Sequence, residues 1–354
     1  MELEDLGFSG WFQDRLKESP LNESGLARII TVHKDNYIVR NKNAEVSAAI
    51  TGKLMYGAES SLDFPAVGDW VGVHYFNENT LAVIHSILPR KSLLKRKAAG
   101  KQIDYQLIAS NIDTAFIIQS GDFDFNLRRL ERYLILVYEG GIKPVMLVSK
   151  SDLITPEELK KKMLEIKNIF PDLKIIAFSN TTEKGLDEIQ HILERGKTYC
   201  LLGSSGVGKT TLINRLIGED IFATNEVREK NGKGRHVTAR RQMVFLEERG
   251  MIIDTPGMRE LGNIKVETGI DETFADIVHL AVDCRYKNCT HTGEPGCSIL
   301  EAVNNGVLNA KRYRNYLKLR RESEYYEMSY LEKRKKDKEF GKKIKSMMKT
   351  KKKI

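Results

Sequence analysis

The chain has 354 residues, 41% hydrophobic and 30% charged, a composition typical of a globular protein with two or three domains. No stretch approaches the roughly 20 apolar residues that span a bilayer, and the acidic N-terminus lacks the pattern of a signal peptide. We therefore expect a cytoplasmic protein without a membrane partner. The net charge of +9 comes from residues 333–354, where twelve Lys or Arg face two acidic residues. Such a tail can contact a phosphate backbone or serve only solubility.

Residues 25–97 carry the pattern of a small β-barrel, and residues 1–24 form an N-terminal extension with a short helical leader. Apolar residues alternate or cluster in five runs, ARIITV, NYIVR, VSAAIT, DWVGVHYF and TLAVIHSIL. Five short strands predict a barrel of the oligonucleotide-binding (OB) type, although a small β-sandwich would give a similar pattern. The basic connector that follows, RKSLLKRKAAGK, can bind phosphate or act as a solvated linker.

Residues 98–264 are expected to form an α/β domain, because strands and helices alternate there. The strands are predicted over residues 114–119, 144–149, 174–179, 198–203, 242–247 and 251–254, and the helices over 126–138, 156–169, 185–194 and 209–217. This alternation predicts a mainly parallel, doubly wound sheet covered on both faces. Residues 265–330 are expected to be helical, over 267–282, 298–304 and from 309 onward, and residues 331–354 form a basic tail.

A phosphate-binding loop joins the strand at 198–203 to the helix that follows it. The segment GSSGVGKT fits the pattern G-x-x-x-x-G-K-[ST], whose glycines let backbone N–H groups converge on phosphate oxygens at a helix N-terminus. Lys209 is expected to neutralise the β- and γ-phosphates, and the Thr210 hydroxyl to ligate Mg²⁺. The nucleotide-binding residues predicted here are Gly203, Ser204, Ser205, Gly206, Val207, Gly208, Lys209, Thr210 and Thr211.

A second phosphate-side segment, DTPG, follows the last strand. Asp254 is predicted to hold Mg²⁺ through water, and Gly257 to offer its backbone N–H to the γ-phosphate. The Gly-rich segment NGKGRHVTARR occupies the position of a first switch, in which Thr238 is predicted to complete the Mg²⁺ coordination; a plain basic loop is the alternative. Many GTPases carry a water-orienting Gln after this glycine, but Met258 stands here, so His236 is the candidate for that role. We expect slow intrinsic hydrolysis that a partner stimulates strongly.

Recognition of the base is predicted for the segment Ser149-Lys-Ser-Asp, which resembles the guanine-reading [NT]-K-x-D element of GTPases. The Asp152 carboxylate can accept hydrogen bonds from N1 and N2 of guanine and would be left unpaired by adenine. The Lys150 stem can lie over the base, and Ser179, at the end of the next strand, can offer a backbone contact to the guanine oxygen. This element ordinarily comes late in a GTPase, but here it precedes the phosphate loop. The order of the parts therefore predicts a circularly permuted GTPase domain.

A cluster of cysteine and histidine residues lies in the helical region. The spacing Cys284-x₄-Cys289-x-His291-x₅-Cys297 supplies three thiolates and one imidazole, a closed tetrahedral set for one structural Zn²⁺. A redox or incidental role is the alternative. The fourth cysteine, Cys200, precedes the phosphate loop in an apolar run and is expected to be a buried core residue.

Together these segments resemble the ribosome small-subunit-dependent GTPase A family of circularly permuted bacterial GTPases. The resemblance covers nearly the whole chain, in VGDWV, RRLERYL, GSSGVGKT, GRHVTAR, DTPG, CRYKNCTHTGEPGC and RYRNYLKL. It implies an OB-type N-terminal domain, a permuted GTPase domain and a C-terminal zinc domain. It also implies a role in late maturation of the small ribosomal subunit, with hydrolysis stimulated by that subunit. Two departures are Ser149 in place of Asn and Val237 in place of Thr, the second of which places more weight on Thr238.

We therefore predict a multidomain α/β protein that hydrolyses GTP to GDP and binds the small ribosomal subunit and its rRNA as a monomer. Its expected cofactors are one structural Zn²⁺ and the Mg²⁺ that accompanies GTP. The alternative is a nucleotide-dependent RNA-binding scaffold with negligible hydrolysis, which Met258 leaves open because the isolated protein could turn over very slowly. An ATP-dependent RNA remodelling enzyme is disfavoured by Asp152.

Overall fold

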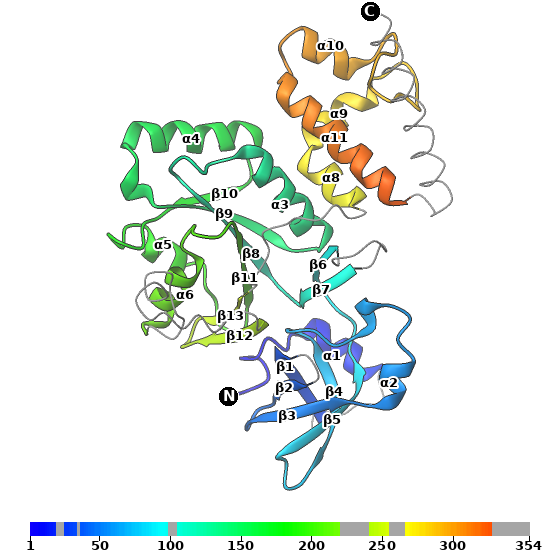
Figure 1. Ribbon diagram of the computed structural model, residues 1–354, viewed down its shortest axis with the longest axis vertical. Coiled ribbons are helices and arrows are strands. Elements are labelled where there is room, and N and C mark those ends of the chain that lie inside the picture. Colours follow the sequence, from blue (N-terminus) through cyan, green and yellow to red (C-terminus); the bar gives the residue numbers. More distant parts are fainter. Residues whose placement is uncertain (19–24, 34–35, 98–104, 220–240, 255–265, 328–354) are drawn as a thin grey trace, which may run out of the picture. The chain divides into compact units, whose positions relative to one another are not determined.

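The computed structural model describes residues 1–18, 25–33, 36–97, 105–219, 241–254 and 266–327. The chain divides into two compact units, Met1–Gly262 and Asn263–Ile354 (Figure 1). The first unit contains a β-barrel and a parallel-sheet domain, and the described part of the second unit is helical. None of the described helices has both the length and the apolar character needed to cross a membrane.

The barrel is closed and has the OB-type topology that the sequence predicts. Its strands pair in the order β1-β2-β3-β5-β4, β4 pairs back onto β1, and β3 and β5 run parallel. Residues that alternate along the strands, such as Ile29, Val39 and Val71, have no exposed surface and fill the interior. The elements are β1 (Leu26–Val32), β2 (Tyr37–Arg40), β3 (Glu45–Ile50), the short helix α2 (Gly52–Tyr56), β4 (Trp70–Phe76) and β5 (Leu81–Ile87).

The N-terminal leader packs against the barrel. Helix α1 (Gly10–Lys17) and the residues before it bury Leu6, Phe8 and Phe12 in one cluster with Trp70. The Phe8 ring meets the Trp70 ring edge-on, with centroids 4.9 Å apart. Such aromatic pairs contribute about 0.5–1.5 kcal/mol beyond the area they bury. The leader is therefore part of the folded barrel rather than a loose extension.

The second part of this unit is a sheet whose strands lie in the order β10-β9-β8-β11-β13-β12. The first five of these strands are parallel, and β12 runs antiparallel to β13. Strand β12 also pairs with barrel strand β1, at Thr31↔Gln242 and Val32↔Arg241, so barrel and sheet form one sheet of eleven strands. The strands are β8 (Thr114–Ser120), β9 (Lys143–Ser149), β10 (Lys174–Ala177), β11 (Thr198–Gly203), β12 (Arg241–Leu246) and β13 (Gly250–Asp254).

Helices cover both faces of this sheet, as the sequence predicts. Helices α5 and α6 lie on one side and α3 on the other (Figure 1). Buried side chains of β8, β9 and β11 form one core cluster with those of α5 and α6. Asn126 caps α3 by accepting hydrogen bonds from the backbone N–H groups of Arg128 and Arg129. The helices are α3 (Leu127–Glu139), α4 (Pro156–Ile169), α5 (Leu186–Gln190) and α6 (Lys209–Ile217).

The connector between barrel and sheet contains a hairpin that the sequence analysis missed. Strand β6 (Leu93–Lys97) pairs antiparallel with β7 (Tyr105–Ser110). The Arg90 guanidinium that precedes it makes two hydrogen bonds of 2.7 and 2.8 Å to the fully buried Asp69 carboxylate. Arg90 is thus part of an internal ion pair and is neither a phosphate ligand nor a solvated linker residue. The hairpin was hidden because β6, with the sequence LLKRK, ends in basic residues in place of an apolar alternation.

The second unit contains helices packed through Phe274 and Tyr316, whose ring centroids lie 5.4 Å apart. The buried Arg312 donates hydrogen bonds to both carboxylate oxygens of Asp276, at 2.6 and 2.9 Å. The helix predicted over 267–282 is two helices, because the backbone of Phe274 leaves the helical region where its ring turns into this core. The helices are α8 (Glu267–Thr273), α9 (Ala275–Val282), α10 (Ser298–Asn304) and α11 (Ala310–Glu327).

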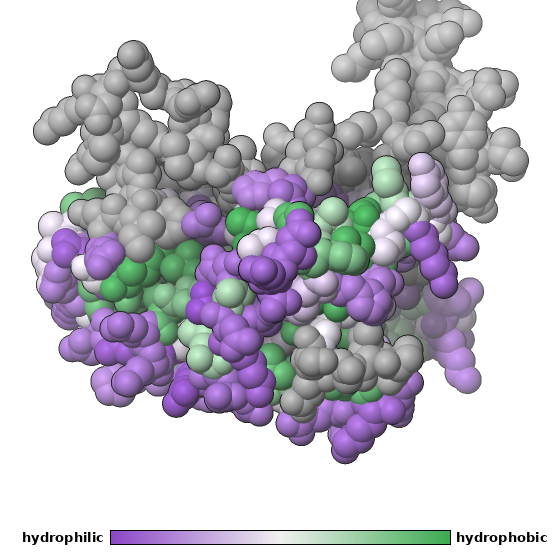
Figure 2. Space-filling model, turned by 90° about the horizontal axis from the view of Figure 1, so that it is seen from below, coloured by the Kyte–Doolittle hydropathy of each residue, from purple (hydrophilic) through white to green (hydrophobic). Residues whose placement is uncertain are grey.

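Hydrophilic side chains cover most of the described surface in the view of Figure 2, and hydrophobic ones form separate patches. The large hydrophobic side chains that remain exposed belong to different elements; they include Tyr56 on α2, Phe123 before α3 and Val282 on α9. Isolated exposed hydrophobic residues of this kind are ordinary on protein surfaces.

Candidate functional site

The phosphate loop joins β11 to α6, as the sequence predicts, and its backbone requires glycine at specific positions. Gly208 has φ +92°, and a Cβ there would lie 2.6 Å from Asn180 Nδ2. Gly203 has φ +155°, and a Cβ there would lie 2.4 Å from the Ile118 carbonyl oxygen. Only glycine combines these dihedral angles with this space. The loop therefore lies tightly against both its neighbouring strand β8 and the residue Asn180.

Lys209 bends back over the phosphate loop from the first turn of α6. Its Nζ donates hydrogen bonds to the carbonyl oxygens of Gly203, at 2.7 Å, and Ser204, at 2.6 Å. Ser205 and Gly206 are exposed at the tip of the loop, and Val207 is buried beneath it. Thr210 and Thr211 follow Lys209 in the first turn of the helix, half-buried. Ammonium group, loop and helix N-terminus are thus brought together at one place.

The segment predicted to read the base lies at the end of β9, two strands from the phosphate loop. Ser149 is fully buried, and its Oγ donates a hydrogen bond of 3.4 Å to the Gln119 carbonyl. The Lys150 backbone is left-handed, with φ +56°, which turns the chain into a short 3₁₀ helix that carries the exposed Asp152. The Ser149 side chain therefore braces β9 against β8, and Asp152 stands free of the sheet at its carboxyl edge.

Ser179 follows the end of β10 and is fully buried. Its Oγ accepts hydrogen bonds of 3.1 Å from the backbone N–H groups of Thr181 and Thr182. The Asn180 side chain donates to the Gly208 carbonyl, at 3.1 Å, and so links this turn to the phosphate loop. Because β9, β10 and β11 are parallel, their carboxyl ends meet at one edge of the sheet.

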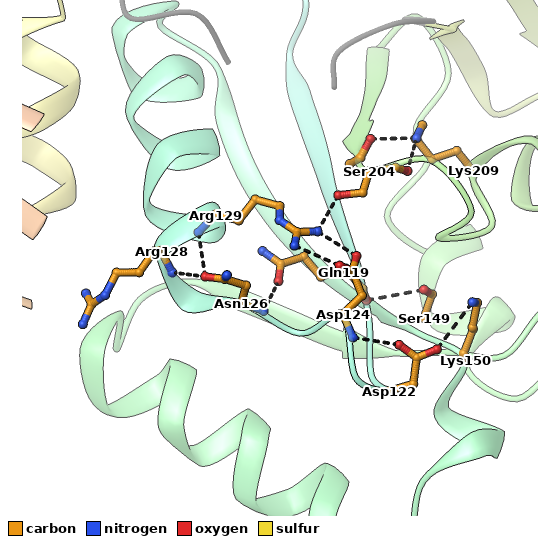
Figure 3. Close-up of polar contacts among 11 residues, drawn as sticks. Gln119, Asp122, Asp124, Asn126, Arg128, Arg129, Ser149, Lys150, Ser204 and Lys209 are labelled. Atoms are coloured by element: carbon orange, nitrogen blue, oxygen red, sulfur yellow. Dashed lines mark hydrogen bonds and ion pairs between the residues drawn. The ribbon is translucent and has the colours of Figure 1, made fainter. Parts of the chain in front are cut away.

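The loop between β8 and α3 contributes polar residues that the sequence analysis did not single out (Figure 3). The Lys150 ammonium lies 3.5 Å from Asp122 Oδ2, and hydrogen bonds to the Asp122 carboxylate outweigh its burial and lower its pKa. Arg129 pairs with Asp124 and reaches Ser204 Oγ, at 2.5 Å; the hydrogen bond that Arg129 donates to the Asp124 carboxylate raises the pKa of Arg129. A signal was present in the sequence GDFDFN, since an acidic loop follows a buried strand at the same edge.

Not every predicted residue of the phosphate side belongs to the described part of the chain. Asp254 is half-buried at the end of β13, the neighbour of β11, and pairs across the sheet with Gln242. His236, Thr238 and Gly257, together with Val237 and Met258, lie outside the described residues. Their predicted roles stay predictions.

The cysteine–histidine cluster is assembled in the second unit as the sequence predicts. The ligand atoms of Cys284, Cys289, His291 and Cys297 all lie within 4.8 Å of one another. His291 Nδ1 lies 3.6 Å from the Sγ atoms of both Cys284 and Cys297. The Tyr313 hydroxyl donates a hydrogen bond of 2.5 Å to the His291 carbonyl and ties the cluster to α11. The four side chains can hold a metal ion, and Cys200 is fully buried in the other unit.

Fold and site together define a class of protein: a circularly permuted GTPase, in which β9 and β10 precede the phosphate-loop strand β11. The family model described as RsgA GTPase matches residues 87–264. The chain is 46% identical over 300 residues to the Small ribosomal subunit biogenesis GTPase RsgA 2 of Lactiplantibacillus plantarum, which covers 85% of this chain and 84% of that protein. A protein of the same name from Vibrio parahaemolyticus is 38% identical over 352 residues, 99% of this chain and 94% of its own. The chain belongs to the RsgA GTPase family.

Two solved structures share the fold. The crystal structure of YjeQ from Thermotoga maritima superposes with a TM-score of 0.62 at 24% identity, over 84% of this chain and 98% of that one. The structure of YloQ, described as a circularly permuted GTPase, superposes with a TM-score of 0.60 at 22% identity, over 86% and 96%. The permuted order of the parts and the barrel that precedes them are thereby confirmed.

Proposed function

We propose that this chain hydrolyses GTP during late maturation of the small ribosomal subunit. One observation carries the proposal: the S-K-x-D segment and the phosphate loop, separated in the chain and in rotated order, meet at one edge of the sheet. The relatives from Lactiplantibacillus and Vibrio are named for small ribosomal subunit biogenesis, and the chain covers most of their length.

Guanine selectivity is assigned to the ends of β9 and β10. The exposed Asp152 carboxylate can accept hydrogen bonds from the N1 and N2 groups of guanine. The left-handed backbone of Lys150 leads into the short 3₁₀ helix that carries Asp152. Ser149 supports this turn from below through its hydrogen bond to Gln119. Ser179 holds the adjoining turn, whose backbone would meet the guanine oxygen.

The phosphates are assigned to the loop formed by residues 203–208, with Lys209, Thr210 and Thr211. Mg²⁺, bound together with GTP, would neutralise charge on the β- and γ-phosphate oxygens, with Thr210, Thr238 and Asp254 as the proposed ligands. Gly257 would offer its backbone N–H to the γ-phosphate, and His236 would position the attacking water. The charge of Lys209 beside the loop carbonyls supports the assignment of the β- and γ-phosphates to this position.

We assign one structural Zn²⁺ to Cys284, Cys289, His291 and Cys297. Zn–S and Zn–N bonds of about 2.3 and 2.0–2.1 Å place neighbouring ligands of a tetrahedral ion about 3.5–3.8 Å apart. The separations of 3.6, 3.6 and 4.0 Å among Cys284, His291 and Cys297 support this assignment. All four positions of such an ion are filled by protein, which is typical of a structural site.

The proposed partner is the small ribosomal subunit with its rRNA, bound by a monomer in the cytoplasm. We assign residues 25–97, an OB-type barrel, and residues 265–330, the helical zinc domain, as RNA-facing modules that precede and follow, along the chain, a GTPase domain at 98–264. OB-type barrels commonly bind nucleic acid on their surface. The basic residues 331–354 add charge that favours a phosphate backbone, and the leader up to the end of α1 packs with the barrel.

Phosphate release from GTP and from ATP, each with and without purified small subunits, tests the proposal. Slow turnover of GTP alone that rises by orders of magnitude with the subunit is expected. Equal use of ATP would overturn the guanine assignment. A second candidate, a nucleotide-dependent RNA-binding scaffold, is favoured by Met258 at the usual position of a water-orienting Gln. Binding of GTP to the subunit complex without stimulated hydrolysis would decide for the scaffold.

A further inference from the structure

The β8–α3 loop, residues 121–126, lies between the two halves of the proposed nucleotide site (Figure 3). At one end, its Asp122 carboxylate meets the Lys150 ammonium of the base-reading segment, at 3.5 Å. At the other end, the first turn of α3 carries Arg129, whose Nη1 donates a hydrogen bond of 2.5 Å to Ser204 Oγ in the phosphate loop. One short segment therefore touches both halves of the site.

The contacts between these two ends are continuous. The Asp124 backbone N–H donates to Asp122 Oδ1, at 3.1 Å. The Asp124 carboxylate accepts hydrogen bonds from both terminal nitrogens of Arg129, at 2.7 and 2.9 Å. This two-pronged arrangement fixes the guanidinium plane more firmly than a single ion pair would. The Ser204 carbonyl oxygen in turn accepts a hydrogen bond of 2.6 Å from the Lys209 ammonium. We call this series the polar relay; its members are Lys150, Asp122, Asp124, Arg129, Ser204 and Lys209.

The polar relay is partly shielded from water. Arg128, which precedes Arg129 in the sequence, is not part of it. The side chains of Arg129 and Asp124 are 27% and 33% exposed. Tyr133, one turn further along α3 and buried, also hydrogen-bonds the Ser204 side chain, so helix α3 holds this serine at two points. Arg128 points away and pairs with Glu131, at 2.8 Å (Figure 3). Arg128 thus has a comparable ion pair, but among the described residues no hydrogen bond or ion pair joins it to the phosphate loop.

We propose that Arg129 is a positioning residue that couples guanine reading to phosphate binding through the polar relay. The proposal rests on the function proposed above. A base that lies over Lys150 would fix the Lys150 side chain against Asp122. Asp122 in turn holds Asp124, and Asp124 holds the Arg129 guanidinium that donates to Ser204. The phosphate loop is then held in place when the base-reading side is engaged. Contributions of Asp122 and Arg129 to nucleotide affinity are consequently not independent.

A double-mutant cycle on the full chain tests the coupling, with a fluorescent GDP analogue and Mg²⁺ as the probe. The variants are Asp122→Asn, Arg129→Gln and the two combined, and Arg128→Gln is the matched control because it also loses an ion pair on α3. We expect both single variants to bind GDP more weakly and the control to bind within about twofold of the wild type. The combined variant should bind at least about fivefold more tightly than the product of the single losses implies.

Two results would overturn the proposal. Losses that simply multiply would show that the two ends act independently, and an equal loss in Arg128→Gln would show a general weakening of α3. If Arg129→Gln fails to fold, the cycle of Asp122→Asn with Ser204→Ala carries the same test, since these two residues lie on either side of Asp124 and Arg129 in the polar relay. A wild-type chain that does not bind GDP would instead contradict the proposed function.

Discussion

Arg28 of barrel strand β1 donates a hydrogen bond of 2.9 Å to Thr198 Oγ1 in β11, the strand that leads to the phosphate loop. The same guanidinium hydrogen-bonds the carbonyl oxygens of Leu6 in the leader, Gly68 in the barrel and Asn111 before β8. The side chain is buried, which lowers its pKa to about 10 and leaves it charged at neutral pH. One buried cation therefore joins leader, barrel and parallel sheet.

Replacing Arg28 by Met should destabilise the junction between barrel and sheet. Several carbonyl groups and a hydroxyl would lose their buried donor, each at a cost of about 1–3 kcal/mol, so we expect a loss of at least about 3 kcal/mol. Hydrogen exchange in β1 and β11, with a thermal melt, measures it. Arg15→Met is the control, because Arg15 lies over the Trp11 ring in α1 and the change should stay within about 0.5 kcal/mol. Unchanged protection in β1 and β11 would contradict this account.

Gly208→Ala should abolish tight binding of guanine nucleotides. Alanine at φ +92° is strained by roughly 1–2 kcal/mol, and its Cβ would collide with the Asn180 amide. The loop must shift, which misplaces the N–H groups proposed to hold phosphate. Titration with GDP measures the effect. Gly10→Ala serves as the control, because a Cβ at Gly10 meets nothing within 4 Å. GDP affinity equal to that of the wild type would show that the loop tolerates the shift.

Asp152→Asn should change the preferred nucleotide from GTP to xanthosine triphosphate. The amide offers a donor where xanthine presents an oxygen and guanine an amino group, so the preferred base is reversed. Nucleotide competition measures the preference, and Asp172→Asn, outside the proposed site, is the control. A variant that retained the wild-type order of preference would remove Asp152 from the base-reading role.

Cys289→Ala should abolish zinc binding and unfold the helical unit. Three remaining ligands hold zinc weakly, and in small domains the binding free energy of the metal is folding free energy. Metal analysis and far-ultraviolet circular dichroism follow both losses, and a chelator should reproduce them in the wild type. Cys200→Ala, at a buried cysteine outside the cluster, should keep the full zinc content. Full zinc content in Cys289→Ala would refute the ligand set.

Local patterns predicted most of the architecture. The five barrel strands alternate apolar residues, and the phosphate loop carries glycines that the observed dihedral angles at Gly203 and Gly208 require. Each predicted strand of the parallel sheet appears with small shifts at its ends. These features depend on a few neighbouring residues, which is why the sequence displays them.

Residues whose roles depend on distant partners were not predictable in this way. Arg28 sits in an apolar run and looks like an interruption, and its partners at Leu6, Asn111 and Thr198 are far away in the chain. Arg129 and Arg128 are adjacent and chemically identical, and only the direction of the helix face separates the arginine that reaches Ser204 from the one that pairs with Glu131. The break at Phe274 arises from tertiary packing in the same way.

The pairing of β1 with β12 has a consequence for solubility. A strand at the edge of a sheet can recruit a strand from another molecule, and proteins counter this with short edges, lysines or coverage. Within the described residues, the open edge is β10, which has four residues and an exposed Lys174. The opposite edge of the parallel domain, β12, pairs with barrel strand β1 at Arg241 and Gln242. A GTPase domain without its barrel would lose this pairing, and the whole six-residue edge of β12 would then be open to another strand. We therefore expect such a domain to self-associate, so the barrel also opposes aggregation.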